Sequence, residues 1–186
     1  MVQVVKPTVA HIREHFLPLS ETFIYQCLKQ GQATTRPVAV YVHRSNEASF
    51  PWDDVYQLSY PPGRFSHERL SAAFLRATRI RPYADSIEGV YLSALRRLKP
   101  DIVHAHFGRD AVNVTPACQK LGIPLVVAFY GYDFAVLPSE ERWSDGYGRV
   151  FRYASRFIVT SSNVCDVDLA IGSQVKARIV DSVAGL

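Results

Sequence analysis

Side chains that could bind a ligand or move protons gather in three short segments, 16–22, 106–110 and 130–133. Each segment follows an apolar run that is typical of a buried strand. In a parallel α/β sheet, the loops that follow the strands emerge at one edge, where ligands bind. Hydroxyl, imidazole and carboxylate groups at that edge therefore predict a site for a polar, hydroxyl-rich ligand.

His104 and His106 stand two residues apart in an expected strand, so both imidazoles would lie on one face of the sheet. Two such imidazoles could ligate one metal ion, as they do in metal-dependent hydrolases. The further His and Asp ligands that those enzymes need are not evident in the sequence. In the favoured alternative, one histidine packs against the sheet and His106 lies at the strand tip, in the cleft.

Sequence motifs for phosphate binding and for hydrolysis do not occur. The strings G-x-G-x-x-G, G-x-x-x-x-G-K-[ST] and G-x-S-x-G are all missing, which argues against a Rossmann phosphate turn, a P-loop and an α/β-hydrolase. Asp166 and Asp168 match a D-x-D cation motif. They fall in an expected helix, where positions i and i+2 point about 200° apart, so we interpret the match as chance.

Several residues of the three segments have more than one expected role. Ser20 should cap a helix over 20–30, with Glu21 in its first turn and Gly31 as its stop. The N–H groups at this helix start could also receive an anion or a sugar hydroxyl. Gly131 permits a tight turn or a close ligand approach. Asp133 is either an acceptor for sugar hydroxyls or an N-cap.

The apolar pattern predicts strands that alternate with helices along the chain. Strands are expected at 9–12, 38–43, 55–59, 101–107, 125–129, 157–160 and 177–183, and helices at 20–30, 70–80, 87–98, 110–121, 139–154 and 163–171. This alternation predicts an α/β fold, a Rossmann-like three-layer domain with a mostly parallel sheet. One domain accounts for all 186 residues.

The net charge of +4 is unevenly distributed along the chain. Between positions 64 and 99 lie Arg64, Arg69, Arg76, Arg79, Arg81, Arg96, Arg97 and Lys99, against Glu68, Asp85 and Glu88. Such an excess favours a phosphate-bearing partner or an anionic membrane surface, and it is equally typical of a solvated helical face. No nucleic-acid-binding signature occurs, so we expect no nucleic-acid partner.

Cysteine usage and hydropathy indicate the cellular compartment. Cys27, Cys118 and Cys165 are widely spaced and form no CxxC pair, which is typical of reduced thiols in a cytosolic protein. No signal peptide is evident, and no apolar run approaches the ~18 residues of a membrane span. We therefore expect a cytoplasmic protein, with any membrane contact peripheral and at the inner face of the plasma membrane.

Three strings resemble the N-terminal domain of the group 1 glycosyltransferases, the retaining GT-B enzymes of family 4. The strings are Phe16-Leu17-Pro18-Leu19-Ser20-Glu21-Thr22-Phe23-Ile24, Pro100-Asp101-Ile102-Val103-His104-Ala105-His106-Phe107-Gly108, and Gly122-Ile123-Pro124 leading to Phe129-Tyr130-Gly131-Tyr132-Asp133. Their order and spacing are similar to those of the branch that builds exopolysaccharides. The segment 156–161 also resembles the family's strand that ends in serine.

The resemblance implies sugar transfer from a nucleotide-diphosphate sugar to a glycan or lipid-linked acceptor, with retention and without a metal or other cofactor. It implies that residues 1–186 form the acceptor-binding half and that the C-terminal donor domain is absent. Since the donor domain neutralises the departing diphosphate, the isolated chain is expected to be inactive. The donor domain would then be a partner, in cis or in trans, of a truncated chain or a split enzyme.

The resemblance also implies roles for the residues of the three segments. The expected catalytic residues are His106, Tyr130 and Asp133, and the expected substrate-binding residues are Ser20, Glu21, Thr22, Gly108, Arg109 and Gly131. The family usually has a histidine at the position of Tyr130. A tyrosine hydroxyl can donate a hydrogen bond, but its pKa of about 10 makes it a poor base at neutral pH.

Two other functions remain open on the residues alone. One is a non-catalytic module that holds a glycan or a nucleotide without turnover. The other is a metal-dependent hydrolase that uses His104 and His106.

Overall fold

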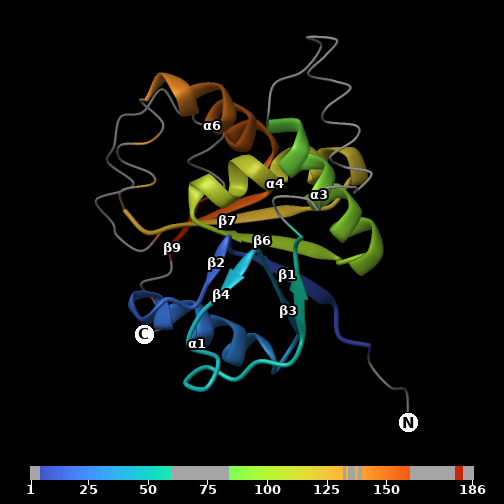
Figure 1. Ribbon diagram of the computed structural model, residues 1–186. Coiled ribbons are helices and arrows are strands. Elements are labelled where there is room, and N and C mark those ends of the chain that lie inside the picture. Colours follow the sequence, from blue (N-terminus) through green and yellow to red (C-terminus); the bar gives the residue numbers. More distant parts are fainter. Residues whose placement is uncertain are drawn as a thin grey trace.

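A computed structural model describes residues 5–59, 84–131, 133, 137, 140–159 and 179–181. The strands of its main sheet are β1 Thr8–Ile12, β3 Arg36–Tyr41, β5 Val55–Gln57, β6 Ile102–His106, β7 Leu125–Phe129, β8 Arg156–Val159 and β9 Ile179–Asp181. They lie in the order β5-β3-β1-β6-β7-β8-β9, and all neighbours are parallel (Figure 1). Two shorter strands, β2 His15–Phe16 and β4 His43–Arg44, form a separate parallel pair.

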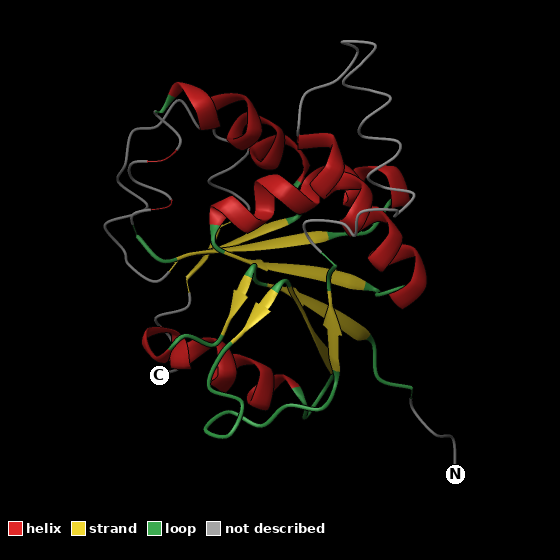
Figure 2. Cartoon of the chain, in the orientation of Figure 1, coloured by secondary structure: helices red, strands yellow, loops and turns green. Residues whose placement is uncertain are grey.

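Helices lie on both faces of the main sheet (Figure 2). The described helices are α1 Thr22–Gly31, α3 Ala84–Leu98, α4 Gly108–Leu121 and α6 Glu141–Tyr153, and the short 3-10 helix η1 Leu19–Glu21 precedes α1. Three of them, α3, α4 and α6, cover one face, and α1 covers the other. The expected α/β fold, with three layers around a parallel sheet, is confirmed.

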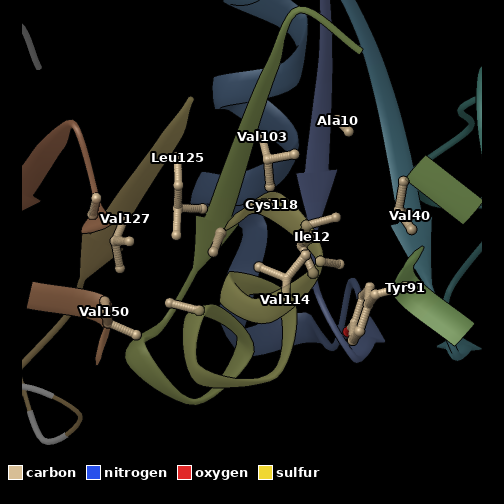
Figure 3. Close-up of a cluster of buried hydrophobic side chains, with 14 of the residues drawn as sticks. Ala10, Ile12, Val40, Tyr91, Val103, Val114, Cys118, Leu125, Val127 and Val150 are labelled. Carbon is tan, nitrogen blue, oxygen red and sulfur yellow. The ribbon is translucent and has the colours of Figure 1, made fainter. Parts of the chain in front are cut away.

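Side chains along each strand alternate between two cores, as the pleat of a strand requires. Ala10, Ile12 and Val103 face the larger core, where Tyr91 of α3 and Val114 of α4 cover them (Figure 3). The alternate residues of these strands, such as His11 of β1 and His104 of β6, face α1. His11 and His104 are direct partners in the β1–β6 register, so their imidazoles lie side by side beneath that helix.

The strand order changes direction between β1 and β6. From β1 the chain proceeds outward to β3 and β5, and it then returns to the other side of β1 for β6, β7, β8 and β9. In open α/β sheets, ligands bind at the carboxyl ends of the strands that flank such a switch point. Those ends lie at Ile12 and His106.

The residues expected to begin and end α1 are both wrong. Ser20 does not cap α1 but lies inside η1, and Glu21 holds the N-cap position without a side-chain cap bond. The reason is tertiary, because the Glu21 carboxylate is bound by Arg13 instead. Gly31 does not follow the helix but is its last residue, and the right-handed Gln32 caps it.

The expected strand over 38–43 is also interrupted. β3 ends at Tyr41, and β4 begins at His43. The N–H groups of Val42 and His43 both donate to the Glu14 carbonyl, at 3.0 and 2.9 Å, which turns the chain into the short β2–β4 pair.

Some expected features lie outside the described residues. These are the helices at 70–80 and 163–171, the pair Asp166 and Asp168, Cys165, and the arginines from Arg64 to Arg81. Within the ranges that are described, no helix has the length and apolarity that a bilayer span requires.

Candidate functional site

An open cavity of about 490 Å³ lies at the carboxyl edge of the sheet, beside the switch point. The segment after β1 contributes Arg13 and Glu14 to its wall, and the start of α4 contributes Arg109. Asp133 follows β7, and Trp143 comes from α6. The cavity therefore combines charged groups with an aromatic surface, which suits a small polar ligand with an apolar face.

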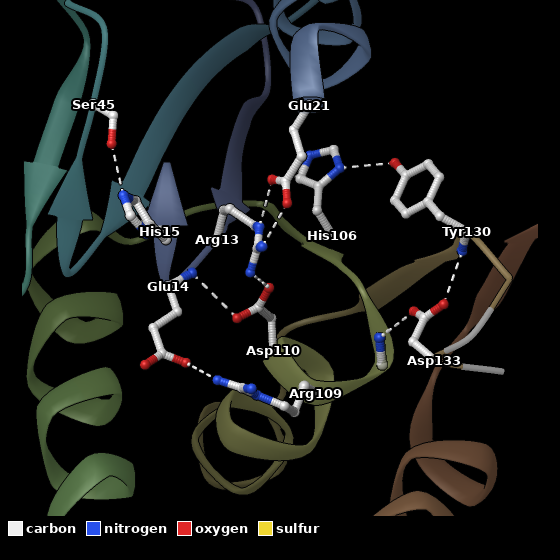
Figure 4. Close-up of polar contacts among 11 residues, drawn as sticks. Arg13, Glu14, His15, Glu21, Ser45, His106, Arg109, Asp110, Tyr130 and Asp133 are labelled. Atoms are coloured by element: carbon white, nitrogen blue, oxygen red, sulfur yellow. Dashed lines mark hydrogen bonds and ion pairs between the residues drawn. The ribbon is translucent and has the colours of Figure 1, made fainter. Parts of the chain in front are cut away.

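Arg13 connects two of the three predicted segments (Figure 4). Its Nε and Nη2 donate to the two oxygens of Glu21 at 2.8 and 2.7 Å, and its Nη1 lies 3.1 Å from Asp110. The guanidinium also stacks over the Phe107 ring, 4.5 Å from its centroid. Burial lowers the pKa of Arg13, but the bonds to Glu21 and the charge of Asp110 raise it on balance. Arg13 thus stays protonated in the cavity wall, with its charge paired to two carboxyl groups.

Asp110 anchors the start of α4 to the end of β1. Its side chain is buried, and its Oδ1 accepts the Glu14 N–H at 3.1 Å. Burial raises the pKa of this carboxyl to about 7, while the Arg13 guanidinium and the Glu14 N–H act in the opposite direction. The carboxyl has no exposed face, so it positions Arg13 rather than a ligand.

Asp133 uses both carboxylate oxygens to hold backbone groups. Oδ2 accepts the Gly108 N–H at 2.8 Å, and Oδ1 accepts the Tyr130 N–H at 3.0 Å. Gly108 is the first residue of α4, so Asp133 caps that helix from a different loop. Its expected role as an acceptor for sugar hydroxyls stays a prediction. Burial raises the pKa of Asp133, and these N–H bonds oppose the rise.

Tyr130 lies between Phe107, which lines the cavity, and the buried His106. Its ring packs against Phe23 and Phe107, with centroids 4.5 and 4.8 Å apart, and its hydroxyl lies 3.0 Å from His106 Nδ1. Burial raises the pKa of the Tyr130 hydroxyl, which therefore stays protonated at neutral pH. The group can donate a hydrogen bond but cannot act as a base.

His106 does not reach the cavity, which corrects the expected arrangement of the two histidines. We expected only one imidazole to pack against the sheet, but His104 and His106 are both buried on the α1 face, and His106 is fully buried. Alternation along β6 explains this, because α1 covers the whole face onto which both residues project. His106 can influence a ligand only through Tyr130.

Of the remaining predicted residues, Arg109 lines the cavity, whereas Ser20, Glu21, Thr22, Gly108 and Gly131 do not. Ser20 and Thr22 are exposed, and Glu21 is buried against Arg13. Arg109 lines the cavity and pairs with Glu14 at 2.8 Å, with half of its side chain exposed. Gly131 has a φ of 116°, a backbone conformation that glycine adopts far more readily than other residues.

Several residues of the cavity wall were missed by sequence reasoning. They are Arg13, Glu14, His15, His43 and Trp143. Arg13 and Glu14 directly follow β1, so the rule that ligands bind after strands already pointed to them. The first polar segment was predicted to begin at Phe16, because the short strands β2 and β4 have no periodic apolar pattern. The position of Trp143 depends on how α6 packs, which no local pattern reveals.

A second cavity, of about 770 Å³, lies at the opposite edge of the sheet. Its wall includes Lys6, Arg36 and Asp54 near the amino ends of β1 and β3. None of the three predicted segments contributes to it. The larger volume is thus separate from the polar groups that the sequence singled out.

A parallel sheet with a ligand-sized cavity at its switch point defines a Rossmann-like binding domain. The profile of Glycosyltransferase Family 4 matches residues 20–180, and the chain belongs to that family. Among curated protein sequences, none matches the chain.

Solved structures of similar fold include transferases and epimerases. The apo lipopolysaccharide outer core galactosyltransferase WaaB is 17% identical, with a TM-score of 0.59 over 93% of this chain and 44% of that one. MurG from Acinetobacter baumannii is 12% identical, with a TM-score of 0.54 over 94% and 44% of the two chains. The UDP-GlcNAc 2-epimerase from Methanocaldococcus jannaschii is 10% identical, with a TM-score of 0.61 over 94% and 45%.

At these identities the likeness shows the fold alone. The chain spans less than half the length of each of these three proteins. Family and fold together make it an N-terminal domain of the GT-B type. They do not favour the alternative functions, a non-catalytic module or a metal-dependent hydrolase.

Proposed function

We propose that this chain is the acceptor-binding half of a retaining glycosyltransferase of the exopolysaccharide type. The reaction moves a sugar from a nucleotide-diphosphate sugar to a glycan or lipid-linked acceptor, and a C-terminal donor domain acts with the chain in cis or in trans. The observation that carries this proposal is the convergence of the segments after β1, β6 and β7 on one cavity in a family 4 domain.

The cavity wall has the chemistry that a pyranose acceptor requires. A sugar ring presents apolar C–H faces and a rim of hydroxyl groups. Trp143 and Phe107 offer aromatic surface, while Arg109 and Glu14 offer donors and acceptors at 52% and 30% side-chain exposure. The exposed hydroxyls of Ser20 and Thr22 lie on the segment that Arg13 ties to the cavity through Glu21.

The expected catalytic residues receive more specific roles in this proposal. The protonated Tyr130 hydroxyl donates a hydrogen bond to the acceptor or to the transferred sugar. His106 is a positioning residue, since it is fully buried and its Nδ1 lies 3.0 Å from that hydroxyl. Asp133 is also a positioning residue, because it holds the Tyr130 and Gly108 backbone.

The donor half has to supply most of the charge that stabilises the leaving diphosphate. Arg13 is already neutralised by Glu21 and Asp110, so its charge is not available to a phosphate. Preorganised donors for the departing diphosphate contribute several kcal/mol to catalysis, on the order of 3 kcal/mol for one hydrogen bond. This agrees with the expectation that the chain alone is inactive.

A reconstitution assay tests the proposal. The chain is combined with the C-terminal half of a family 4 enzyme, a panel of labelled nucleotide-diphosphate sugars and an extract of membrane glycolipids and glycans. We expect label to enter the acceptor fraction, with retained anomeric configuration, only when both halves are present. Transfer by the donor half alone, an inverted product, or no transfer with the whole panel would contradict the proposal.

The proposed lipid-linked acceptor also implies peripheral contact with an anionic membrane at its cytoplasmic face. The arginines of 64–99 are the residues that favour it, and Arg76, Arg79 and Arg81 lie outside the described part of the chain. Replacing these three by glutamate should reduce sedimentation with anionic liposomes, whereas Arg36→Glu at the opposite sheet edge should not. Equal sedimentation of all variants would remove the membrane contact from the proposal.

A further inference from the structure

Four potential metal ligands meet between α1 and the main sheet. They are His11 of β1, His104 and His106 of β6, and Cys27 of α1. One ligand atom from each residue lies within 4.8 Å of those of the other three. The imidazoles pack closely, with ring centroids 5.1 Å apart for His11 and His104 and 4.3 Å apart for His104 and His106. Both the strand pairing and the helix packing are needed to assemble this cluster.

The polar atoms of the cluster are not fully satisfied by the protein. His104 Nε2 is buried and has no hydrogen-bond partner among the described residues, and the residue is only 8% exposed. Leaving such a nitrogen unpaired is unfavourable, because its hydration is lost on burial and no partner replaces it. His11 Nδ1 and His106 Nε2 lie only 3.0 Å apart, so one of them must carry a proton toward the other. The three buried imidazoles thus form one hydrogen bond among themselves, and Tyr130 supplies a second one to His106.

We propose that His11, His104, His106 and Cys27 bind one transition-metal ion, of which zinc is the best fit. Imidazole nitrogen and thiolate sulfur are the ligands that zinc prefers, at about 2.1 and 2.3 Å. At those bond lengths, neighbouring ligand atoms of a tetrahedral site lie roughly 3.5 Å apart. The ligand atoms of the cluster are at most 4.8 Å apart, so side-chain shifts of about 1 Å would bring all four to zinc. The proposal does not depend on the transferase activity.

The protonation states of the four residues and the net charge of the site are compatible with a bound zinc ion. Burial lowers the pKa values of His11, His104 and His106, so all three are neutral, which is the form that binds metal. Burial raises the pKa of Cys27, so its thiol proton must leave to solvent as the zinc–sulfur bond forms. Two positive charges of zinc and one thiolate leave a net charge of +1.

The site is closed, which distinguishes it from a hydrolytic centre. Four protein ligands complete a tetrahedral shell, and three of the four residues are buried. No position remains for the water molecule that a zinc hydrolase activates. The ion instead cross-links β1, β6 and α1.

The bound ion would also fix the tautomer of His106. When Nε2 binds the metal, the ring proton stays on Nδ1 and is donated to the Tyr130 oxygen, 3.0 Å away. The Tyr130 hydroxyl proton is then directed elsewhere. Without the metal, Nδ1 can be the unprotonated nitrogen, and the Tyr130 hydroxyl then donates its proton to His106 and not to a ligand.

Metal retention tests the site directly. The tag-free chain is loaded with zinc, dialysed against metal-free buffer and analysed by elemental mass spectrometry, and cobalt(II) then serves as a spectroscopic probe. We expect about one zinc per chain, and intense visible cobalt bands of tetrahedral type together with a thiolate-to-cobalt charge-transfer band. Cys27→Ser should abolish the charge-transfer band, and His104→Ala should lower zinc affinity more than tenfold.

The surface histidines supply the matched control. His15 and His43 contact each other, with ring centroids 6.0 Å apart, and neither belongs to the cluster. The double variant His15→Ala/His43→Ala should retain zinc like the unmodified chain. The proposal would be overturned if zinc were lost on dialysis, or if the cobalt spectrum lacked a thiolate band. It would also be overturned if Cys27→Ser and His104→Ala retained as much zinc as the unmodified chain. Circular dichroism of each variant separates loss of the ion from loss of the fold.

Discussion

Arg13 is the residue on which the geometry of the cavity depends. It binds Glu21 through two hydrogen bonds and Asp110 through one, and it lies over Phe107. A guanidinium presents its donors in a planar fork, so this arrangement fixes direction as well as distance. The segments after β2 and β6 are thereby held in one position relative to β1.

Replacing Arg13 by alanine should strongly destabilise the chain. The change leaves Glu21 and Asp110 buried without their counter-ion, and breaking a buried pair in this way costs about 3–5 kcal/mol. Urea unfolding followed by circular dichroism measures the loss. The pair Arg36–Asp54 is the matched control, because it has the same two-bond geometry at 59% and 42% side-chain exposure.

Arg36→Ala should cost less than about 1 kcal/mol, since solvent screens an exposed pair. Equal losses for Arg13→Ala and Arg36→Ala would show that burial of the Arg13 pair contributes nothing, and the role assigned to Arg13 would be wrong.

At the scale of elements, the start of α4 is the junction between fold and site. Phe107 precedes the helix with a φ of 78°, an unusual conformation for a residue with a side chain. Asp133 binds the N–H of Gly108 from the next loop, and Tyr147 of α6 donates to the Asp133 carbonyl at 2.6 Å. Helices α4 and α6 are thus joined where both reach the cavity.

Gly108→Ala should disturb this junction. A Cβ at this position would lie 2.7 Å from the ring carbons Cε1 and Cζ of Tyr147, which is fully packed and cannot move freely. Such overpacking costs about 1–3 kcal/mol, which thermal or urea unfolding would detect. Gly89→Ala in α3 is the control, because a Cβ there meets nothing within 4 Å. It should stabilise the chain by about 0.5–1 kcal/mol, and a stable Gly108→Ala variant would contradict the packing described.

Sequence patterns predicted the elements best where an apolar run decides the outcome by itself. The strand at 125–129 was predicted with both ends correct, and the helix at 87–98 was three residues short at its start. The errors arise where a distant partner competes with a local signal. Ser20 had the sequence of an N-cap, but the Arg13–Glu21 bonds moved the start of α1. Two-residue strands such as β2 are too short to produce a period.

At the scale of the whole molecule, the site arises from strand order. Residues 11 and 104 are far apart in sequence but become neighbours because β1 pairs with β6. A periodic pattern predicts that His104 and His106 share a face, but it cannot say that His11 joins them. The rule for parallel sheets predicted that the three segments meet at one edge. It could not predict that Arg13 and Trp143 line the cavity there, because that depends on how the elements pack.

The whole molecule should lose stability at alkaline pH. Burial raises the pKa values of Tyr91 and Tyr147, and it raises the pKa of Cys118 to about 12. Above about pH 9 the unfolded chain loses protons that the folded chain retains, so the free energy of unfolding falls as pH rises toward the folded pKa values. Each group contributes up to about 1.4 kcal/mol per pH unit. Urea unfolding at about pH 8 and about pH 10.5 measures this slope.

Tyr91→Phe provides the comparison for this prediction. The buried Tyr91 hydroxyl has no hydrogen-bond partner within the described residues, so its removal should be neutral or stabilising near pH 8. The variant should also show a shallower decline toward pH 10.5. An unchanged slope would mean that Tyr91 ionises in the folded chain as it does when unfolded.

The most direct test of the acceptor site compares two arginines in the reconstituted transfer assay. Arg109 and Arg36 are both exposed and both paired with a carboxylate, but Arg109 lines the carboxyl-edge cavity and Arg36 lies at the opposite edge. Initial transfer rates are measured for Arg109→Ala and Arg36→Ala at low acceptor concentration. We expect at least a tenfold reduction for Arg109→Ala, and a rate within twofold of the unmodified chain for Arg36→Ala. Equal rates for the two variants, or a loss confined to Arg36→Ala, would contradict the placement of the acceptor at the switch point.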